Sequence, residues 1–129
     1  MIRANAIVVI DDDDDDRFLL AESFRISGVK QKIVELSCAY ELIALLDKWH
    51  TAPNLILLDV EMPAMDGLEL MGVFHKYIQL TETPKIMLSR NPAYREPARQ
   101  AGADDFYVKP VTLDEYLDLA RTIRQEYLA

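Results

Sequence analysis

The chain has 129 residues, of which 50% are apolar, and 14 lysine and arginine residues against 22 aspartate and glutamate residues give it a formal net charge of -8. This balance disfavours direct nucleic-acid binding, because affinity for phosphate backbones comes mainly from clustered positive charge. The sequence has neither a signal-peptide pattern nor an apolar stretch near the roughly 20 residues of a membrane helix. We therefore expect one cytoplasmic domain over residues 1–129, with no membrane contact.

Five short apolar runs, taken in chain order, predict the strands of a sheet. They cover residues 6–10, 33–36, 55–58, 86–88 and 106–108. Most of these runs are continuously apolar rather than alternating, a pattern that is typical of strands buried on both faces of a parallel sheet. The runs thus predict a parallel sheet that is covered by helices on both sides.

Segments with helical periodicity separate these runs, and one such segment follows each strand. The first of them ends at Gly28, a residue that often stops helices. The third is expected to begin at Asp66, with Glu69 as a possible reciprocal cap three residues later. The fifth is expected to begin at Thr112, with Glu115 as its possible reciprocal cap.

The fourth helix is the least regular of the five. Pro92 suits a first helical turn, but Pro97 would damage the helix at any deeper position, so we expect a helix that is short or starts late and ends near Gly102. Strands that alternate with helices at this spacing indicate a (βα)5 chain, which folds as a three-layer α/β sandwich around a parallel five-stranded sheet.

Acidic residues follow two of the predicted strands. Residues 11–16 are six consecutive aspartates directly after the first strand, and Asp59 follows the third. Ligands of open parallel sheets collect at the carboxyl ends of strands, so Asp11, Asp12 and Asp59 converge if these strands are neighbours. Carboxylates so close would raise one another's pKa unless a cation lies among them. An oxygen-only site of this kind suits Mg2+.

The rest of the aspartate run has a different interpretation. Residues 13–16 are expected in the loop and the first helical turn, where a helix N-terminus favours acidic side chains, and they add solubility. A solvated acidic loop is the alternative explanation for the whole run. The position of Asp11 and Asp12 directly after an apolar strand favours a functional role for these two.

Two segments give the sequence a family resemblance. Residues 59–67, DVEMPAMDG, resemble the loop that follows the phosphoacceptor aspartate in response-regulator receiver domains, and residues 106–110, FYVKP, resemble their conserved-lysine segment. Together with the acidic pair after the first strand and Ser89 at the end of the fourth, these pieces cover the chain in the expected order. The resemblance, which is to single-domain receivers of the chemotaxis-regulator type, implies the flavodoxin-like fold with strand order 2-1-3-4-5.

The resemblance also implies a role for each matching residue. Asp59 would be the phosphoacceptor and a metal ligand. Asp12 would bind Mg2+ directly and Asp11 largely through water, and the backbone carbonyl of Glu61 would complete the protein's share of the ligands. Lys109 would supply a second positive charge to the phosphoryl group.

Two residues match the switch positions of the family. The Ser89 hydroxyl would hydrogen-bond a phosphoryl oxygen once Asp59 is modified, and rotation of the Phe106 ring would be coupled to this movement. A turn serine and a core phenylalanine are the alternative interpretations. Tyr107 points to the opposite face from Phe106 and is expected to pack.

Arg90 departs from the family pattern, in which a small residue usually follows the switch hydroxyl. A guanidinium here would either crowd the phosphodonor or clamp the phosphoryl group, so we expect Arg90 to change the rate of phosphorylation or of dephosphorylation. Glu61 and Asn91 occupy positions that flank the attacking water in the family, two residues after Asp59 and Ser89. They are predicted to tune the lifetime of the phosphoryl group.

The predicted function is that of a signalling module rather than an enzyme. A sensor histidine kinase or a histidine phosphotransfer protein would donate the phosphoryl group, and a changed surface at the fourth helix, fifth strand and fifth helix would control a downstream protein. The chain would be a monomer or a weak homodimer without an organic cofactor. Two alternatives stay open: an unphosphorylated interaction module with this fold, and an aspartyl-nucleophile phosphohydrolase, a class that usually carries a second aspartate where Glu61 stands.

Overall fold

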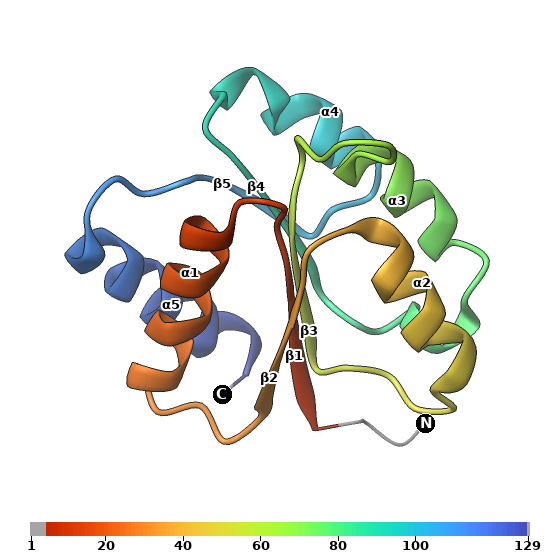
Figure 1. Cartoon of the computed structure of the whole chain (residues 1–129), viewed down its shortest axis with the longest axis horizontal. Coiled ribbons are helices and arrows are strands. Elements are labelled where there is room, and N and C mark those ends of the chain that lie inside the picture. The colour runs from red at the N-terminus through yellow and green to blue at the C-terminus, as the bar shows by residue number, and fades with distance from the viewer. Residues whose placement is uncertain (1–4, 129) are drawn as a thin grey trace.

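A computed structural model describes residues 5–128, and these residues form one sheet with helices on both sides (Figure 1). The strands are β1 (Ala6–Ile10), β2 (Lys32–Leu36), β3 (Leu55–Asp59), β4 (Lys85–Ser89) and β5 (Asp105–Val108). The α-helices are α1 (Asp14–Ile26), α2 (Ala39–Lys48), α3 (Gly67–Phe74), α4 (Arg95–Gln100) and α5 (Leu113–Tyr127). The short 3-10 helices η1 (Ile78–Leu80) and η2 (Pro92–Tyr94) precede β4 and α4.

All strands of the sheet are parallel, and their order is β2-β1-β3-β4-β5. This confirms the predicted flavodoxin-like arrangement. Every residue of β1 and β3 is buried, because these strands lie inside the sheet, whereas the edge strands β2 and β5 are partly exposed. The strand order reverses between β1 and β3, so their carboxyl ends border the crevice where this architecture binds ligands.

The helices form the two outer layers of the sandwich. In Figure 1, α1 and α5 lie side by side on one face of the sheet, and α2, α3 and α4 cover the other. Successive strand residues alternate between the two cores: Val8 and Ile56 pack under the three-helix layer, and Ile7 and Leu55 pack under α1 and α5. None of the helices in the described part of the chain is long and apolar enough to cross a membrane.

The expected starts of α3 and α5 are confirmed as N-caps. The Asp66 carboxylate accepts from the N–H of Glu69 at 2.8 Å, and the Glu69 carboxylate accepts from the N–H of Asp66 at 3.1 Å, which completes a capping box. Thr112 accepts from the N–H of Glu115 at 3.2 Å. Here the reciprocal bond differs, because the Thr112 hydroxyl rather than its N–H donates to the Glu115 carboxylate, at 2.9 Å.

The fourth helix is short and starts late, as its prolines predicted. Pro92 begins η2, and α4 begins only at Arg95, so Pro97 lies in the first turn of α4, where an N–H has no partner within the helix. The chain leaves this helix at Gly102, whose φ of 100° favours glycine.

Gly67 joins α3 to the end of β3 at a point with no room for a side chain. Its N–H donates to the carbonyl of Val60 at 2.8 Å, and an added Cβ would overlap the backbone carbonyl of Asp59 and lie 3.0 Å from Val60 Cα. We expect Gly67→Ala to lower the free energy of unfolding by about 2 kcal/mol, because backbone atoms have to move.

Gly72→Ala in the same helix is the matched control. Within residues 5–128, nothing lies within 4 Å of a Cβ added at Gly72, so alanine should leave the stability unchanged or raise it through helix propensity. Urea denaturation of both variants measures the difference. Equal stability of the Gly67 and Gly72 variants would contradict the steric explanation.

Candidate functional site

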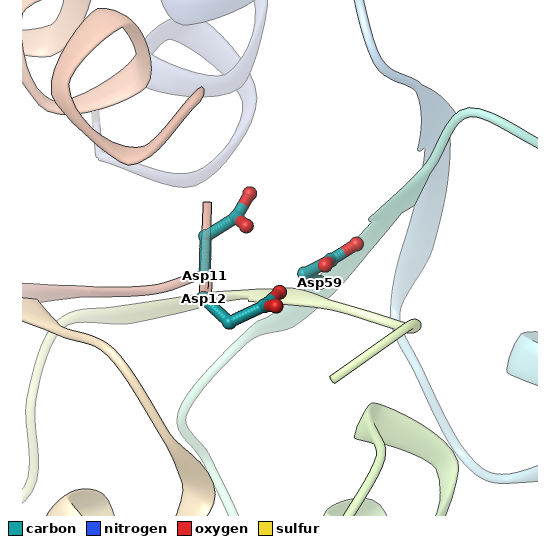
Figure 2. Close-up of side chains that lie close together, drawn as sticks. All are labelled: Asp11, Asp12 and Asp59. Atoms are coloured by element: carbon teal, nitrogen blue, oxygen red, sulfur yellow. The ribbon is translucent and has the colours of Figure 1, made fainter. Parts of the chain in front are cut away.

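Two acidic segments meet at the carboxyl edge of the sheet. Ile10 pairs with Leu58 in the parallel register, so the next residues, Asp11 and Asp59, lie level with each other. One carboxylate oxygen from each of Asp11, Asp12 and Asp59 lies within 4.8 Å of the others. Figure 2 shows Asp12 pointing toward Asp59, with Asp11 beside them. The structure thus brings together the three acids that were predicted as metal ligands, with Asp12 the exposed one.

Lys109 follows β5 and lies against these acids. Its Nζ is 2.8 Å from Asp11 Oδ2, 3.1 Å from Asp16 Oδ2 and 3.3 Å from Asp59 Oδ1. Burial by itself would lower the pKa of this ammonium, but the hydrogen bond and charge of Asp11, together with the charge of Asp59, outweigh burial and raise it. Lys109 therefore stays charged at neutral pH and acts as a counterion of these acids.

The pKa of Asp59 is strongly shifted by the surroundings of its side chain. Burial, followed by the charge of Asp11, raises the pKa of Asp59 to about 7, although Lys109 opposes this shift. Burial also raises the pKa of Asp11, again against the effect of Lys109. One ammonium thus does not compensate for the acids around it. Together with Asp12, these two acids make a set of three carboxylates. Such a set fits a hard divalent cation such as Mg2+, which would supply the positive charge that Lys109 alone does not.

Asp16 is a site residue that the sequence interpretation missed. Its two carboxylate oxygens accept from Nη2 of Arg90 at 2.6 and 2.8 Å, and Oδ2 also accepts from Nζ of Lys109 at 3.1 Å. The expected capping role is confirmed for Asp13, whose carboxylate accepts from the N–H of Asp16 at 2.9 Å. The expectation of solvated, capping side chains was wrong for Asp16, which is buried and ion-paired.

Helical spacing was the signal that would have found Asp16. Leu20 and Phe24 follow it by four and eight residues, and both are buried on the inward face of α1. A run of identical residues has no periodicity of its own, so the pattern appears only when the run is aligned with the apolar residues beyond it.

Ser89 ends β4 and is already hydrogen-bonded on both sides. Its hydroxyl donates to Glu61 Oε1 at 2.8 Å and accepts from the N–H of Asn91 at 3.0 Å. The Asn91 side chain accepts from the N–H of Ala93 at 2.9 Å and so caps η2. Glu61 and Asn91 thus both contact the proposed switch serine or its loop.

Phe106 is buried in the core under α4, while Tyr107 packs on the other side of the sheet, as expected for successive strand residues. The Arg95 guanidinium lies 5.1 Å from the centroid of the Phe106 ring, and its Nη1 donates to the Phe106 carbonyl at 3.1 Å. No sequence pattern indicated this contact, which connects the proposed switch aromatic to the first turn of α4.

The sequence matches one protein family over most of its length. The family described as the response regulator receiver domain matches residues 7–121, a range that includes the acids after β1, Asp59, Ser89 and Lys109. The chain therefore belongs to the receiver domains of two-component response regulators, which are regulatory phosphoacceptor domains with an acidic Mg2+ pocket.

Three relatives show the range of proteins that carry similar segments. An uncharacterised 14.6 kDa protein from the sodA1 3′ region of Leptolyngbya boryana is 38% identical over 96 residues, which are 70% of this chain and 67% of that protein. The probable transcriptional regulator ycf27 of Cyanophora paradoxa is 33% identical over 93 residues, 70% of this chain but 37% of that protein. A protein-glutamate methylesterase/protein-glutamine glutaminase of Ralstonia nicotianae is 38% identical over 78 residues, 54% of this chain but 20% of that protein. The chain thus spans well under half of the last two proteins.

Solved structures share the fold. The phosphorylated cyanobacterial phytochrome response regulator RcpA has a TM-score of 0.85 at 23% identity, over 96% of this chain and 94% of that chain. The Mn2+-bound form of response regulator Rcp1 has a TM-score of 0.80 at 22% identity, over 95% and 94%. The chemotaxis response regulator CheY4 of Vibrio cholerae has a TM-score of 0.76 at 22% identity, over 95% and 99%. At these identities the likeness establishes the fold alone.

Proposed function

We propose that this chain is a phosphorylation switch of a two-component phosphorelay in which Asp59 accepts the phosphoryl group. One observation carries the proposal: Asp59 is a buried carboxylate at the end of β3, with oxygens of Asp11 and Asp12 within 4.8 Å and Lys109 Nζ at 3.3 Å. The chain would then be a regulatory domain over residues 1–129 rather than an enzyme with a separate substrate.

The chemistry requires position and charge more than covalent assistance. A carboxylate oxygen of Asp59 attacks the phosphorus atom of the donor, the bond between phosphorus and the donor breaks, and its electron pair leaves with the donor. The ionised carboxylate is the reactive form and needs no general base. Because burial raises the pKa of Asp59 to about 7, a cation beside the side chain favours the reactive form near neutral pH.

We infer that Asp11, Asp12 and Asp59 hold Mg2+, with the backbone carbonyl of Glu61 as a further protein ligand. Bound Mg2+ would neutralise charge on the transferring phosphoryl oxygens. The clustering of three carboxylates supports this inference, because hard cations prefer oxygen ligands. Lys109, 3.3 Å from Asp59, adds a positive charge that does not depend on the metal.

The response to phosphorylation is proposed to pass through Ser89 and Phe106. Ser89 donates to Glu61, so binding a phosphoryl oxygen requires the hydroxyl to give up this hydrogen bond. Phe106 is held by Arg95 at the start of α4, which would couple movement of the ring to the position of that helix. The surface formed by α4, β5 and α5 would change as a result. Glu61 would thereby influence the lifetime of the phosphoryl group, as would the loop residue Asn91.

A sensor histidine kinase or a histidine phosphotransfer protein is the proposed donor, and a downstream protein is the proposed reader of the switch surface. Membership of the receiver-domain family supports the donor class. The formal net charge of -8 supports a protein rather than a nucleic acid as the direct partner. A cytoplasmic location and a monomeric or weakly dimeric state stay predictions from the sequence.

Beryllofluoride, a mimic of the phosphoryl group, tests the proposal at equilibrium. We expect fluorine NMR to show a bound signal when the protein, beryllofluoride and Mg2+ are mixed, because Asp59 and Lys109 together complete the coordination and charge of the mimic. Asp59→Asn should abolish the signal, whereas Asp114→Asn, at an exposed position in α5, should retain it. An equal bound signal in the Asp59 variant would contradict the assignment.

A further inference from the structure

Asp16 joins two cations that follow different strands. Arg90 comes directly after β4, and Lys109 comes directly after β5. Both donate hydrogen bonds to the carboxylate of Asp16, which lies in the first turn of α1. The side chains of Asp16 and Lys109 are 9% and 7% exposed, whereas that of Arg90 is 58% exposed. The contact between Asp16 and Lys109 is therefore buried, and Arg90 closes it from the solvent side.

Lys109 divides its three donors among three carboxylates. Two of them, Asp11 and Asp59, belong to the proposed metal site, where a divalent cation would offset their charge. Asp16 lies outside the proposed metal site and forms ion pairs with Arg90 and Lys109. A divalent cation in the metal site would thus replace Lys109 as the counterion of Asp11 and Asp59. Asp16 would remain as the anionic partner of Lys109.

We propose that Asp16 competes with the phosphoryl group on Asp59 for Lys109, and that Arg90 weakens this competition by neutralising Asp16. The inference rests on the proposed function, because it concerns the same phosphorylation site. A phosphoryl group brings up to about two negative charges to Asp59 and requires a counterion. When Lys109 turns to it, Asp16 loses one of its two cations, and Arg90 compensates for that loss.

Arg90 is therefore a positioning residue that acts through Asp16, and it is not a clamp on the phosphoryl group. Both Asp16 oxygens accept from the same Nη2 of Arg90, at 2.6 and 2.8 Å. If Arg90 left Asp16 together with Lys109, a buried carboxylate would stay without a cation, which is strongly unfavourable. These contacts thus favour an arrangement in which Lys109 moves to the phosphoryl group while Arg90 stays paired with Asp16.

A double-mutant cycle distinguishes an Arg90 that acts through Asp16 from an Arg90 that contacts the phosphoryl group directly. Asp16→Asn keeps the shape of the side chain and removes the competing charge, so we expect phosphorylation by acetyl phosphate and affinity for beryllofluoride to increase about fivefold. Arg90→Ala leaves Asp16 to Lys109 alone, so we expect both quantities to fall by a similar factor. In the Asp16→Asn background, Arg90→Ala should change neither quantity, because its target is gone.

Asp15→Asn is the matched control, since it removes the same charge from an exposed neighbour in the same helical turn. It should leave the rate and the affinity near those of the native chain. Thermal unfolding of each variant reports on folding. A purely structural Asp16 would lower the unfolding midpoint and the rate together, whereas the proposed competitor raises the rate when it is removed.

Three outcomes would overturn the inference. If Asp16→Asn fails to increase the rate, Asp16 is no competitor. If Arg90→Ala lowers the rate by the same factor in both backgrounds, Arg90 contacts the phosphoryl group directly. In both cases the native chain is still phosphorylated, so the proposed function stands. If the native chain forms no adduct and binds no beryllofluoride, the proposed function fails and this inference fails with it.

Discussion

Replacing Lys109 by methionine should lower the free energy of unfolding of the metal-free protein by about 3 kcal/mol at neutral pH. The ammonium is the shared cation of three buried carboxylates, with Nζ 2.8 to 3.3 Å from Asp11, Asp16 and Asp59. Removing one partner of a buried ion pair is costly because the opposite charge stays buried without compensation. Methionine keeps the length and apolar stem of the side chain, so the loss reports mainly on charge. Urea denaturation monitored by circular dichroism measures it.

Two conditions should reduce this loss. Millimolar Mg2+ would restore positive charge among the acids, and a pH near 5 would let Asp59, whose pKa burial raises to about 7, take up a proton. Lys76→Met, at an exposed position, is the control and should be close to neutral. A Lys109 variant as stable as the Lys76 variant, with no response to Mg2+, would show that Lys109 is not the counterion of these acids.

Asp59→Asn should have the opposite effect and stabilise the metal-free protein, by about 1–3 kcal/mol above neutral pH. Burial and the charge of Asp11 raise the pKa of Asp59 in the folded chain to about 7, from an ordinary value of 3.8. Between these two values the folded state binds more protons than the unfolded state, so stability falls as the pH rises from about 4 to about 7. Asparagine has no carboxyl proton to lose and stays neutral, so it removes this contribution.

The pH dependence distinguishes this effect from a general change in packing. Native and Asp59→Asn proteins should have similar stability at low pH and diverge as the pH rises to about 7, when no divalent cation is present. Added Mg2+ should reverse the order, because the native carboxylate binds the cation and the amide binds it weakly. Parallel stability curves for the two proteins between pH 4 and pH 8 would show that Asp59 does not titrate as described.

Strand and helix patterns were enough to predict the architecture. The central strands are continuously apolar because they are covered on both faces, and the capping box at Asp66 and Glu69 marks the start of α3. The position of Pro97 correctly predicted a short fourth helix, because proline is tolerated only in a first turn. These features depend on local sequence, so reasoning from neighbouring residues recovers them.

The convergence of Asp11, Asp12 and Asp59 was also predictable, because parallel strands place their carboxyl ends at one edge of the sheet. Asp16 was not predicted; its helical spacing from Leu20 and Phe24 indicates a buried position on α1, but the cations that pair with it are far away in the sequence. Its partner Arg90 is 74 residues further along the chain.

Side-chain contacts between separate segments of the chain were likewise not predictable from the sequence patterns. The hydrogen bond from Ser89 to Glu61 and the contact of Arg95 with Phe106 depend on side-chain rotamers and on how the segments that carry them pack together. No periodicity encodes such pairs, because each partner is placed by tertiary packing rather than by its neighbours.

Intact-mass spectrometry after incubation with acetyl phosphate is the most direct test of phosphoryl transfer to Asp59. The native chain should gain the mass of one phosphoryl group when Mg2+ is present, and it should gain much less after chelation of divalent cations. Asp59→Asn should gain none, while Asp15→Asn, at an exposed aspartate, should behave like the native chain. A native chain without an adduct, or an equal adduct on the Asp59 variant, would contradict the assignment of Asp59 as the phosphoacceptor.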